Sequence, residues 1–194
     1  MAVPIPKLTP EEYLEIERKA EYKSEYFNGE MFAMAGGAPN HHRLAFRMNG
    51  LLFKLLDGRD CEAFTSDAKV RTHPRGLYTY PDLTVVCGKA TFAADQRDVL
   101  TNPKVIFELL SPSTEAHDRG LKFQQYKLID SLQEYVLISQ FEPLVESFYR
   151  SPGGAWGDYS EFMGLDAVLK LKSIDIEIPL ADIYRNIDLT ADLL

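Results

Sequence analysis

The sequence predicts a mixed α/β (α+β) fold in which helices flank a mixed β-sheet, with a hairpin before the sheet and antiparallel strands after it. Three observations support this prediction. Apolar runs such as VIFELL have the length and composition of strands that are buried on both faces. Segments with a helical hydrophobic period lie between such runs, and the last third of the chain alternates apolar and polar residues. Helices packed against a sheet are the architecture that this order of elements favours.

The composition is that of an ordinary globular protein. With 194 residues, 45% of them hydrophobic and 26% charged, the chain can bury a substantial core, and we expect one domain over residues 1–194. The net charge of −8 argues against non-specific coating of nucleic acid but is compatible with a carboxylate cluster that awaits a divalent cation. No apolar run reaches the ~20 residues that span a bilayer, and no signal-peptide core is present. We therefore expect a cytoplasmic protein with no membrane partner.

The two cysteines, Cys61 and Cys87, lie in separate strand-like segments without C-x-x-C or histidine spacing. Such cysteines are typical of buried reduced thiols rather than of a zinc site or a disulfide framework. We therefore expect no redox chemistry.

The first third of the chain predicts a helix, a hairpin and a second helix. Thr9, Pro10 and Glu12 form a capping box with proline at the first helical position. Asn28-Gly29, between runs of aromatic and apolar residues, is the strongest two-residue hairpin signal. Apolar residues then recur at three- and four-residue intervals over residues 40–56, which predicts a helix with one core-facing stripe.

The middle of the chain predicts strands and one further helix. Strand candidates are CEAFTSDAKVRT (61–72), YPDLTVVCG (80–88) and KVIFELLS (104–111), and the polar stretch between the last two is expected to be a solvated loop or to hold a short helix. A helix capped by Ser113 or Thr114 is predicted over residues 113–129. This helix forms a crossover long enough for parallel pairing with the next strand, EYVLISQ.

The C-terminal part of the chain predicts antiparallel strands with one solvated face. These strands are LVESFYR, WGDYSEFM and AVLKLKS, and a short helix is expected near residues 180–184. The aromatic residues of this region could form a dimer surface or could equally belong to the core, and they are Phe148, Tyr149, Trp156, Tyr159 and Phe162.

Two of the predicted strands carry an acid next to apolar residues. Glu108 lies in the centre of VIFELL, and Asp82 follows Pro81 directly before the run LTVV. A buried carboxylate is costly unless it is paired, coordinated or protonated. If neighbouring strands bring the two acids together, their oxygens can share a Mg²⁺ ion, a hard cation that prefers oxygen ligands.

A lysine on the following helix completes this pattern. Lys122, Gln125 and Tyr126 are spaced three and four residues apart, so they lie on one helix face, which we expect to face the sheet. An ammonium group near two acids and a metal can stabilise the charge of a phosphate or help to activate a water molecule. This combination of groups is typical of nucleases.

As an ordered set, these residues resemble the Uma-type putative restriction endonuclease family within the PD-(D/E)XK nuclease superfamily. The set comprises EYFNGEMFAMAGGAPNHHRLA, Pro81-Asp82, Glu108, SPST, Asp118-Arg119-Gly120, Lys122, Tyr126 and EYVLIS. The resemblance implies a restriction-endonuclease-like core that acts on DNA. It also implies that Asp82, Glu108 and the backbone carbonyl of Leu109 bind Mg²⁺, with Mn²⁺ as a possible substitute. Glu25 resembles the extra acid that such nucleases supply from an N-terminal element, and His42 lies where the family tends to have histidine.

One departure from the superfamily pattern concerns the lysine. The superfamily places a lysine two residues after the acid, where this sequence has Leu110. In the Uma-like pattern the lysine lies on the next helix, which makes Lys122 the expected replacement. The sequence therefore predicts a Mg²⁺-dependent endodeoxyribonuclease with Asp82, Glu108, Lys122 and Glu25 as catalytic residues. A homodimer is also expected, because cutting both strands of a duplex requires two cleavage events.

Other interpretations of these residues stay open. Asp82 could be a turn residue after proline, and Glu108 could form a structural ion pair with Lys122 or Arg119. Lys122 could extend along the helix to water, Glu25 could pair across the hairpin with a lysine, and Tyr126 could be a core aromatic residue. His41-His42 could be only capping and surface residues. At the level of function, the alternatives are a catalytically degenerate nuclease-fold protein that binds nucleic acid or protein, and a hydrolase of small phosphoesters.

Overall fold

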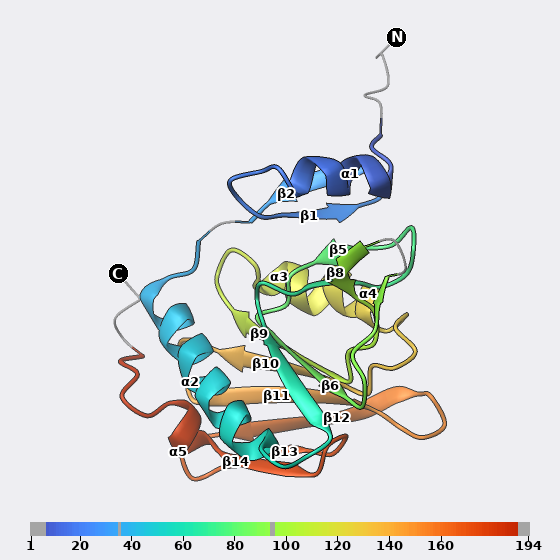
Figure 1. The fold of residues 1–194 in the computed structure, drawn as a ribbon. Helices are drawn as coiled ribbons and strands as arrows, with labels where there is room; N and C mark the ends of the chain where they lie inside the picture. Colours follow the sequence, from blue (N-terminus) through green and yellow to red (C-terminus); the bar gives the residue numbers. More distant parts are fainter. Residues whose placement is uncertain (1–6, 35, 94–95, 190–194) are drawn as a thin grey trace.

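The computed structural model describes residues 7–34, 36–93 and 96–189. Its strands form a sheet that includes the N-terminal hairpin, a central mixed sheet and a two-stranded sheet (Figure 1). The expected mixed sheet flanked by helices is therefore present. The prediction of one domain over residues 1–194 extends beyond the described residues and stays a prediction.

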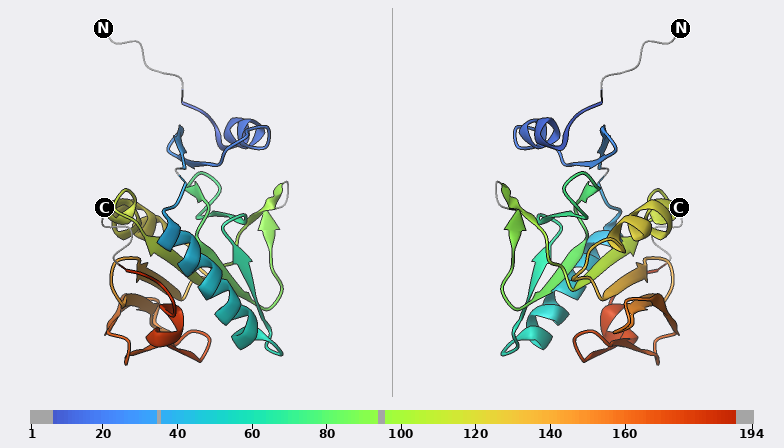
Figure 2. Two further views of the ribbon diagram at one scale, coloured as in Figure 1. Left: turned by 90° about the vertical axis from the view of Figure 1, so that its left-hand side faces the viewer. Right: turned by 90° about the vertical axis from the view of Figure 1, so that its right-hand side faces the viewer.

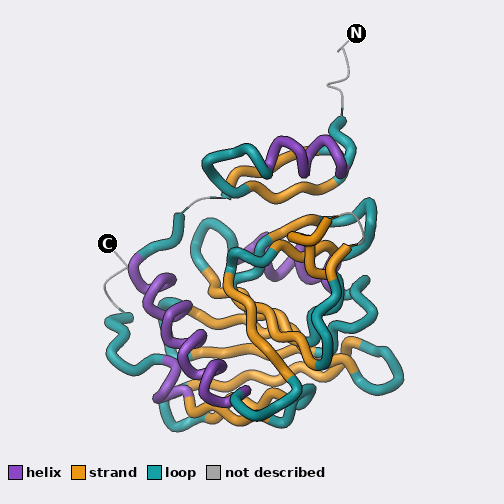
Figure 3. The backbone as a smooth tube through the Cα atoms, in the orientation of Figure 1, coloured by secondary structure: helices purple, strands orange, loops and turns teal. Residues whose placement is uncertain are grey.

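The N-terminal layer has the predicted helix and hairpin. Helix α1 (Pro10–Glu17) begins with the capping box, in which the Thr9 hydroxyl accepts from the Glu12 amide at 3.2 Å and the Glu12 carboxylate accepts from the Thr9 amide at 2.7 Å. Strands β1 (Ser24–Phe27) and β2 (Glu30–Ala33) pair around Asn28-Gly29, which both have positive φ. Figure 3 shows this helix and hairpin stacked as one layer at the end of the molecule.

The hairpin belongs to a sheet with the strand order β2-β1-β5-β4-β8-β7. The pairings are antiparallel except for β4 with β8, which run parallel. The strands added to the hairpin are β4 (Lys69–Arg71), β5 (Tyr78–Thr79), β7 (Phe92–Ala93) and β8 (Gln96–Leu100).

The central sheet has the strand order β12-β11-β10-β9-β6-β3. Strands β9 and β10 pair in parallel, as the predicted crossover requires, and the other neighbours are antiparallel. The strands are β3 (Cys61–Thr65), β6 (Leu83–Cys87), β9 (Val105–Leu110), β10 (Glu134–Ser139), β11 (Leu144–Arg150) and β12 (Trp156–Met163).

Helix α2 (Pro39–Leu56) covers one face of the central sheet. Its apolar stripe packs with β13 (Val168–Leu171), β14 (Ile176–Pro179), α5 (Leu180–Ile183) and the sheet in one buried cluster. Figure 2 shows α2 running obliquely along the molecule, away from the N-terminal layer. The helical segment after β9 packs in a separate buried cluster through Phe123 and Tyr126.

Alternation along β9 decides where Glu108 points. Val105, Phe107 and Leu109 belong to the cluster with α2, whereas Ile106 and Leu110 belong to the cluster with Phe123 and Tyr126. Because side chains two residues apart in a strand share a face, Glu108 faces the helical segment that follows β9.

Three predicted elements need correction. Residues 61–72 form two strands in different sheets, because a turn after Thr65 separates β3 from β4. The polar stretch before β9 forms the antiparallel strands β7 and β8 instead of a loop or a short helix. The helix predicted over 113–129 is shorter and is interrupted: α3 (Glu115–His117), a π-helical turn η1 (Asp118–Lys122) and α4 (Phe123–Tyr126) follow one another, and Thr114 precedes them without a side-chain cap bond.

The prediction that the cysteines are buried reduced thiols is wrong. Cys61 and Cys87 form a disulfide and are only half-buried. The antiparallel register of β3 and β6 places the two residues directly opposite each other. Spacing along the sequence carries no information about such a cross-strand register, so the sequence could not predict the pair.

The C-terminal aromatic residues contribute mainly to packing. Phe148 and Trp156 pack against the cluster around Phe123, and Phe162 packs against the cluster under α2, while Tyr159 is about half exposed on β12. Across the described ranges, no helix is both long enough and apolar enough to cross a membrane.

Candidate active site

Asp82, directly before β6, and Glu108, within β9, are brought together by an adjacent antiparallel strand pair. The register pairs Leu83 with Phe107, so the positions one step further along, Asp82 and Glu108, are neighbours across the strands. Both residues line the same cavity, which has a volume of about 510 Å³. The two carboxylates therefore do not lie on opposite sides of the sheet. Further lining residues include Lys23, His41, His42, Tyr80, Asp118 and Lys122.

Asp82 has two partners. Its Oδ2 atom accepts a hydrogen bond from the Leu109 amide at 2.7 Å, and its Oδ1 atom lies 3.0 Å from Nε2 of His41 on α2. Burial raises the pKa of Asp82 above its usual value, and the charge of His41 and the amide of Leu109 oppose this shift. A turn residue after proline would not need such partners, so the local contacts favour a functional or structural role for this carboxylate.

Glu108 is almost completely buried, with 2% of its surface exposed. Its Oε1 atom accepts hydrogen bonds from the Tyr126 hydroxyl at 2.8 Å and from Nζ of Lys122 at 3.2 Å. Burial raises the pKa of Glu108 well above its usual value; Lys122 acts against this shift, whereas Asp118 and Asp82 add to it. The strand-centre carboxylate thus has the partner that its burial demands.

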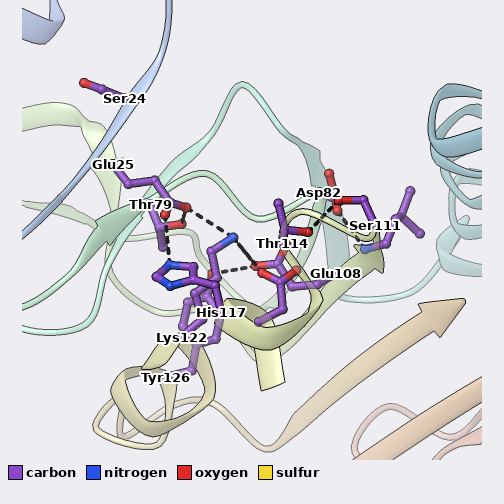
Figure 4. Close-up of polar contacts among 12 residues, drawn as sticks. Ser24, Glu25, Thr79, Asp82, Glu108, Ser111, Thr114, His117, Lys122 and Tyr126 are labelled. Atoms are coloured by element: carbon purple, nitrogen blue, oxygen red, sulfur yellow. Dashed lines mark hydrogen bonds and ion pairs between the residues drawn. The ribbon is translucent and has the colours of Figure 1, made fainter. Parts of the chain in front are cut away.

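Lys122 lies at the centre of the polar cluster. Its Nζ atom contacts three carboxylates. It lies 3.1 Å from Glu25 and 3.2 Å from Glu108 (Figure 4), and 3.1 Å from Asp118. Burial alone would lower the pKa of Lys122, but these three carboxylates raise it well above its usual value. Lys122 is therefore a charged group in the protein interior and does not extend to water.

Glu25 reaches the cluster from strand β1. It accepts hydrogen bonds from the Thr79 hydroxyl and from His117, whose Nε2 lies 3.3 Å away, in addition to its contact with Lys122. Burial would raise the pKa of Glu25, but His117, Lys122 and Thr79 lower it to about 2. Glu25 does not line the cavity, so it contacts Lys122 from behind.

Some site residues were not predicted from the sequence. His41 contacts Asp82 instead of capping α2, whose N-cap is Ala38. Asp118 contacts Lys122 four residues later, a spacing that could have indicated it. Of the undecided residues, Tyr126 donates to Glu108, His42 lines the cavity, and the side-chain oxygen of Gln125 is buried without a hydrogen-bond partner in the described part of the chain.

The residues fit a cation that uses few protein ligands. Three carboxylates contact the Lys122 ammonium group and Asp82 lines the same cavity, so negative charge is in excess, and the oxygen donors of Asp82 and Glu108 suit Mg²⁺. The Leu109 amide points at Asp82, and because N–H and C=O of one strand residue point to the same side, the Leu109 carbonyl lies on that side too. Residues 7–34, 36–93 and 96–189 hold no group of three or more His, Cys, Asp or Glu side chains placed to bind a metal. The predicted ligand set is of a different kind, because it has only two carboxylate side chains and takes its third oxygen from a backbone carbonyl.

Fold and site together define a nuclease-like α+β protein with a buried acid and lysine cluster beside a cavity. The Uma2 family, described as "putative restriction endonuclease", matches residues 10–180, and the chain belongs to this family. The predicted membership is thereby confirmed.

Individual relatives extend the comparison. The uncharacterized protein slr1290 of Synechocystis sp. is 38% identical to this chain, and the match covers 96% of this chain and 96% of slr1290. The uncharacterized protein sll1609 of the same organism is 36% identical, and the match covers 87% of this chain and 95% of sll1609. A crystal structure of a putative nuclease belonging to DUF820 from Anabaena variabilis superposes with a TM-score of 0.75 at 17% identity, and covers 91% of this chain and 97% of that one. At this identity the likeness shows the fold.

Proposed function

We propose that this protein is a Mg²⁺-dependent endonuclease that hydrolyses phosphodiester bonds of DNA. The observation that supports this most directly is that Asp82, Glu108 and Lys122 line one cavity, although they come from the residue before β6, from β9 and from the π-helical turn η1. Membership of the Uma2 family supports the same activity. We also propose a cytoplasmic location and a homodimer, and light scattering of the purified protein tests the dimer.

Each residue has a role in the proposed reaction. Asp82, Glu108 and the carbonyl of Leu109 would hold Mg²⁺, which would supply Lewis-acid stabilisation of the phosphate charge. Lys122 places a positive charge at the cavity wall, where it balances the charge of the phosphodiester and orients the attacking water. Glu25 positions the Lys122 ammonium through its ion pair and thereby assists the water indirectly, while the Tyr126 hydroxyl holds Oε1 of Glu108 by a hydrogen bond.

A cleavage assay tests this function. Plasmid and single-stranded DNA are incubated with increasing Mg²⁺ or Mn²⁺ and with wild type, Asp82→Asn or Glu108→Gln. Glu177→Gln is the matched control, because Glu177 is an exposed acid on β14 that does not line the cavity. We expect metal-dependent cleavage by wild type and by the control, and none by the two site variants. Metal-dependent cleavage that Asp82→Asn leaves unchanged would remove the assignment.

A second candidate is a nuclease-fold protein that binds nucleic acid or protein without turnover. Two observations favour it: Leu110 occupies the position of the superfamily lysine, and Lys122 is held by three carboxylates. Calorimetry separates the two candidates. For the binding module we expect no heat of Mg²⁺ binding at millimolar concentrations and a more stable fold after Glu108→Gln, because burial disfavours the ionised form of Glu108 and Lys122 keeps Glu25 and Asp118 as partners.

A further inference from the structure

The outer face of α2 carries two unusually exposed aromatic side chains. Phe46 is 83% exposed and Phe53 is 81% exposed. They are seven residues apart, and at about 100° per residue this spacing brings them to within about 20° of the same direction. His42 and Asn49 lie on the same narrow stripe, since they are four residues before Phe46 and four before Phe53. Single exposed apolar residues are common, but two aligned and exposed phenylalanines form an apolar patch, which is typical of an interaction site.

A cationic stripe runs beside these phenylalanines. Arg43, Arg47 and Lys54 lie about 60–120° further around the helix, and α2 contains no acidic residue although the chain has a net charge of −8. Within the described ranges, none of the three cations pairs with a carboxylate: Arg43 donates to the Asn40 side chain and Arg47 to the Arg185 carbonyl. Their positive charge is therefore available to an anionic ligand.

A groove between α2 and β3 connects this face to the candidate active site. Asn49 lines both the cavity of Asp82 and Glu108 and a second cavity of about 560 Å³. Phe53 lines the second cavity from α2. On the β3 side, Cys61, Glu62 and Ala63 line the second cavity, and Thr65 and Ser66 line the first. Helix α2 and strand β3 lie side by side (Figure 1). Because Asn49 lines both cavities, they are successive parts of one groove.

We propose that the outer face of α2 binds an unpaired nucleic-acid strand and leads it into this groove, toward the cavity of Asp82 and Glu108. The inference rests on the proposed function, because it assigns the substrate of that same site. Phe46 and Phe53 would stack on bases, whose faces are accessible in a single strand and hidden in a duplex. Arg43, Arg47 and Lys54 would lie along the phosphates. Asp57, Glu62 and Arg59 line the outer cavity, so its charged side chains carry one net negative charge, which favours the cationic side of α2 for the backbone.

Charge decides between this ligand and a protein partner. A helix with five basic or imidazole side chains and no acid is complementary to a polyanion, and the chain's overall negative charge makes this local arrangement stand out. A groove that ends at the candidate phosphodiesterase site is also placed to deliver a polynucleotide to it. A second copy of the chain, docked through the two phenylalanines, is the competing occupant that the experiment must distinguish.

Binding is measured separately from cleavage. The probes are a short fluorescein-labelled oligothymidylate and the duplex that it forms with oligoadenylate of equal length, and fluorescence anisotropy is recorded in EDTA, so that no turnover occurs. The variants are Phe46→Ala/Phe53→Ala, the ring-preserving Phe46→Tyr/Phe53→Tyr, and Lys54→Gln. Met163→Ala is the matched control, since Met163 is an exposed apolar residue on β12 at the opposite edge of the central sheet.

We expect wild type to bind the single strand more tightly than the duplex. The double alanine variant should bind the single strand roughly 5- to 150-fold more weakly for each base face lost, as base stacking on aromatic rings predicts. The tyrosine variant and Met163→Ala should bind like wild type, and Lys54→Gln should reduce the slope of log affinity against log salt by about 1.

Several results would overturn the inference. These are unchanged single-strand affinity in the double alanine variant, equal affinity for both probes, or a dimer that dissociates in that variant while oligonucleotide binding persists. The proposed function is judged separately: cleavage lost in Asp82→Asn with normal binding in the double alanine variant would keep the nuclease and reject the groove. Tight, ring-dependent binding without cleavage at any Mg²⁺ or Mn²⁺ concentration would keep the groove and reject the nuclease.

Discussion

The Nζ atom of Lys122 lies 3.2 Å from Oε1 of Glu108, and this contact joins the helical segment after β9 to the centre of β9. Lys122 is 5% exposed and Glu108 is 2% exposed, so both charges are withdrawn from water. Ion pairs at such depth gain little net stability, because desolvation offsets the attraction between the charges. Breaking one is costly, however, and this asymmetry makes Lys122 a position where stability and function can be tested together.

Lys122→Met should destabilise the fold. The substitution leaves Glu108, Glu25 and Asp118 without their common counter-ion, and removing one partner of a buried pair typically costs about 3–5 kcal/mol. Urea unfolding at neutral pH measures the loss. The deficit should shrink as the pH falls, because protonation neutralises the remaining carboxylates. Lys170→Met is the control: Lys170 pairs with Glu177 at 3.1 Å but is exposed, so it should have little effect. Equal effects of the two substitutions would contradict a structural charge cluster.

Glu25→Gln should lower stability in a pH-dependent way. The pKa of Glu25 is lowered from 4.5 to about 2 in the folded protein, so its ionised form stabilises the fold above pH 4.5 and this contribution is lost as the pH falls toward 2. The shift corresponds to about 3 kcal/mol at neutral pH. Wild type and variant are compared by urea unfolding from pH 7 to pH 3. We expect their difference to fall by more than half over this range. A difference that stays constant with pH would mean that Glu25 acts through packing alone.

Much of the fold follows from local sequence signals. The capping box at Thr9 and the turn at Asn28-Gly29 are encoded within four residues or fewer, and both are present. The apolar run of β9 and the length of the crossover predict that β9 pairs in parallel with β10, and the two strands do so. Short strands such as β7 and β8 were missed because they are stabilised by pairing with each other and with β4, which their own residues do not reveal.

The site was predictable where an isolated polar residue contradicted its apolar surroundings. Glu108 and Asp82 stand out in this way, and helix periodicity directed Lys122 toward them. His41 had no such signal, because its contact with Asp82 depends on how α2 packs on the sheet. The pairing of Cys61 with Cys87 likewise depends on cross-strand register, a long-range property.

The disulfide should contribute measurably to stability. Its cysteines are 26 residues apart, and a loop of this length predicts a loss of about 3–4 kcal/mol when the bond is removed. Cys61→Ala/Cys87→Ala is compared with wild type by urea unfolding, with and without a reductant. Reductant should destabilise wild type and leave the variant unchanged. Thiol titration of denatured, unreduced wild type should find no free thiol, and two free thiols would contradict the bond.

The position of the lysine can be tested by moving it back. Leu110 is buried in the cluster with Phe123 and Tyr126, on the same face of β9 as Glu108, so Leu110→Lys alone should destabilise the fold by placing a second ammonium group in an apolar environment. In Lys122→Met/Leu110→Lys the new ammonium lies two residues from Glu108 and can replace the lost counter-ion. The combined loss of stability should therefore be smaller than the sum of the single losses, as expected for residues that share a partner.

If Lys122 replaces the superfamily lysine, metal-dependent cleavage should be lost in Lys122→Met and partly restored in the double variant. Full cleavage by Lys122→Met would show that the ammonium group serves the fold and not the reaction.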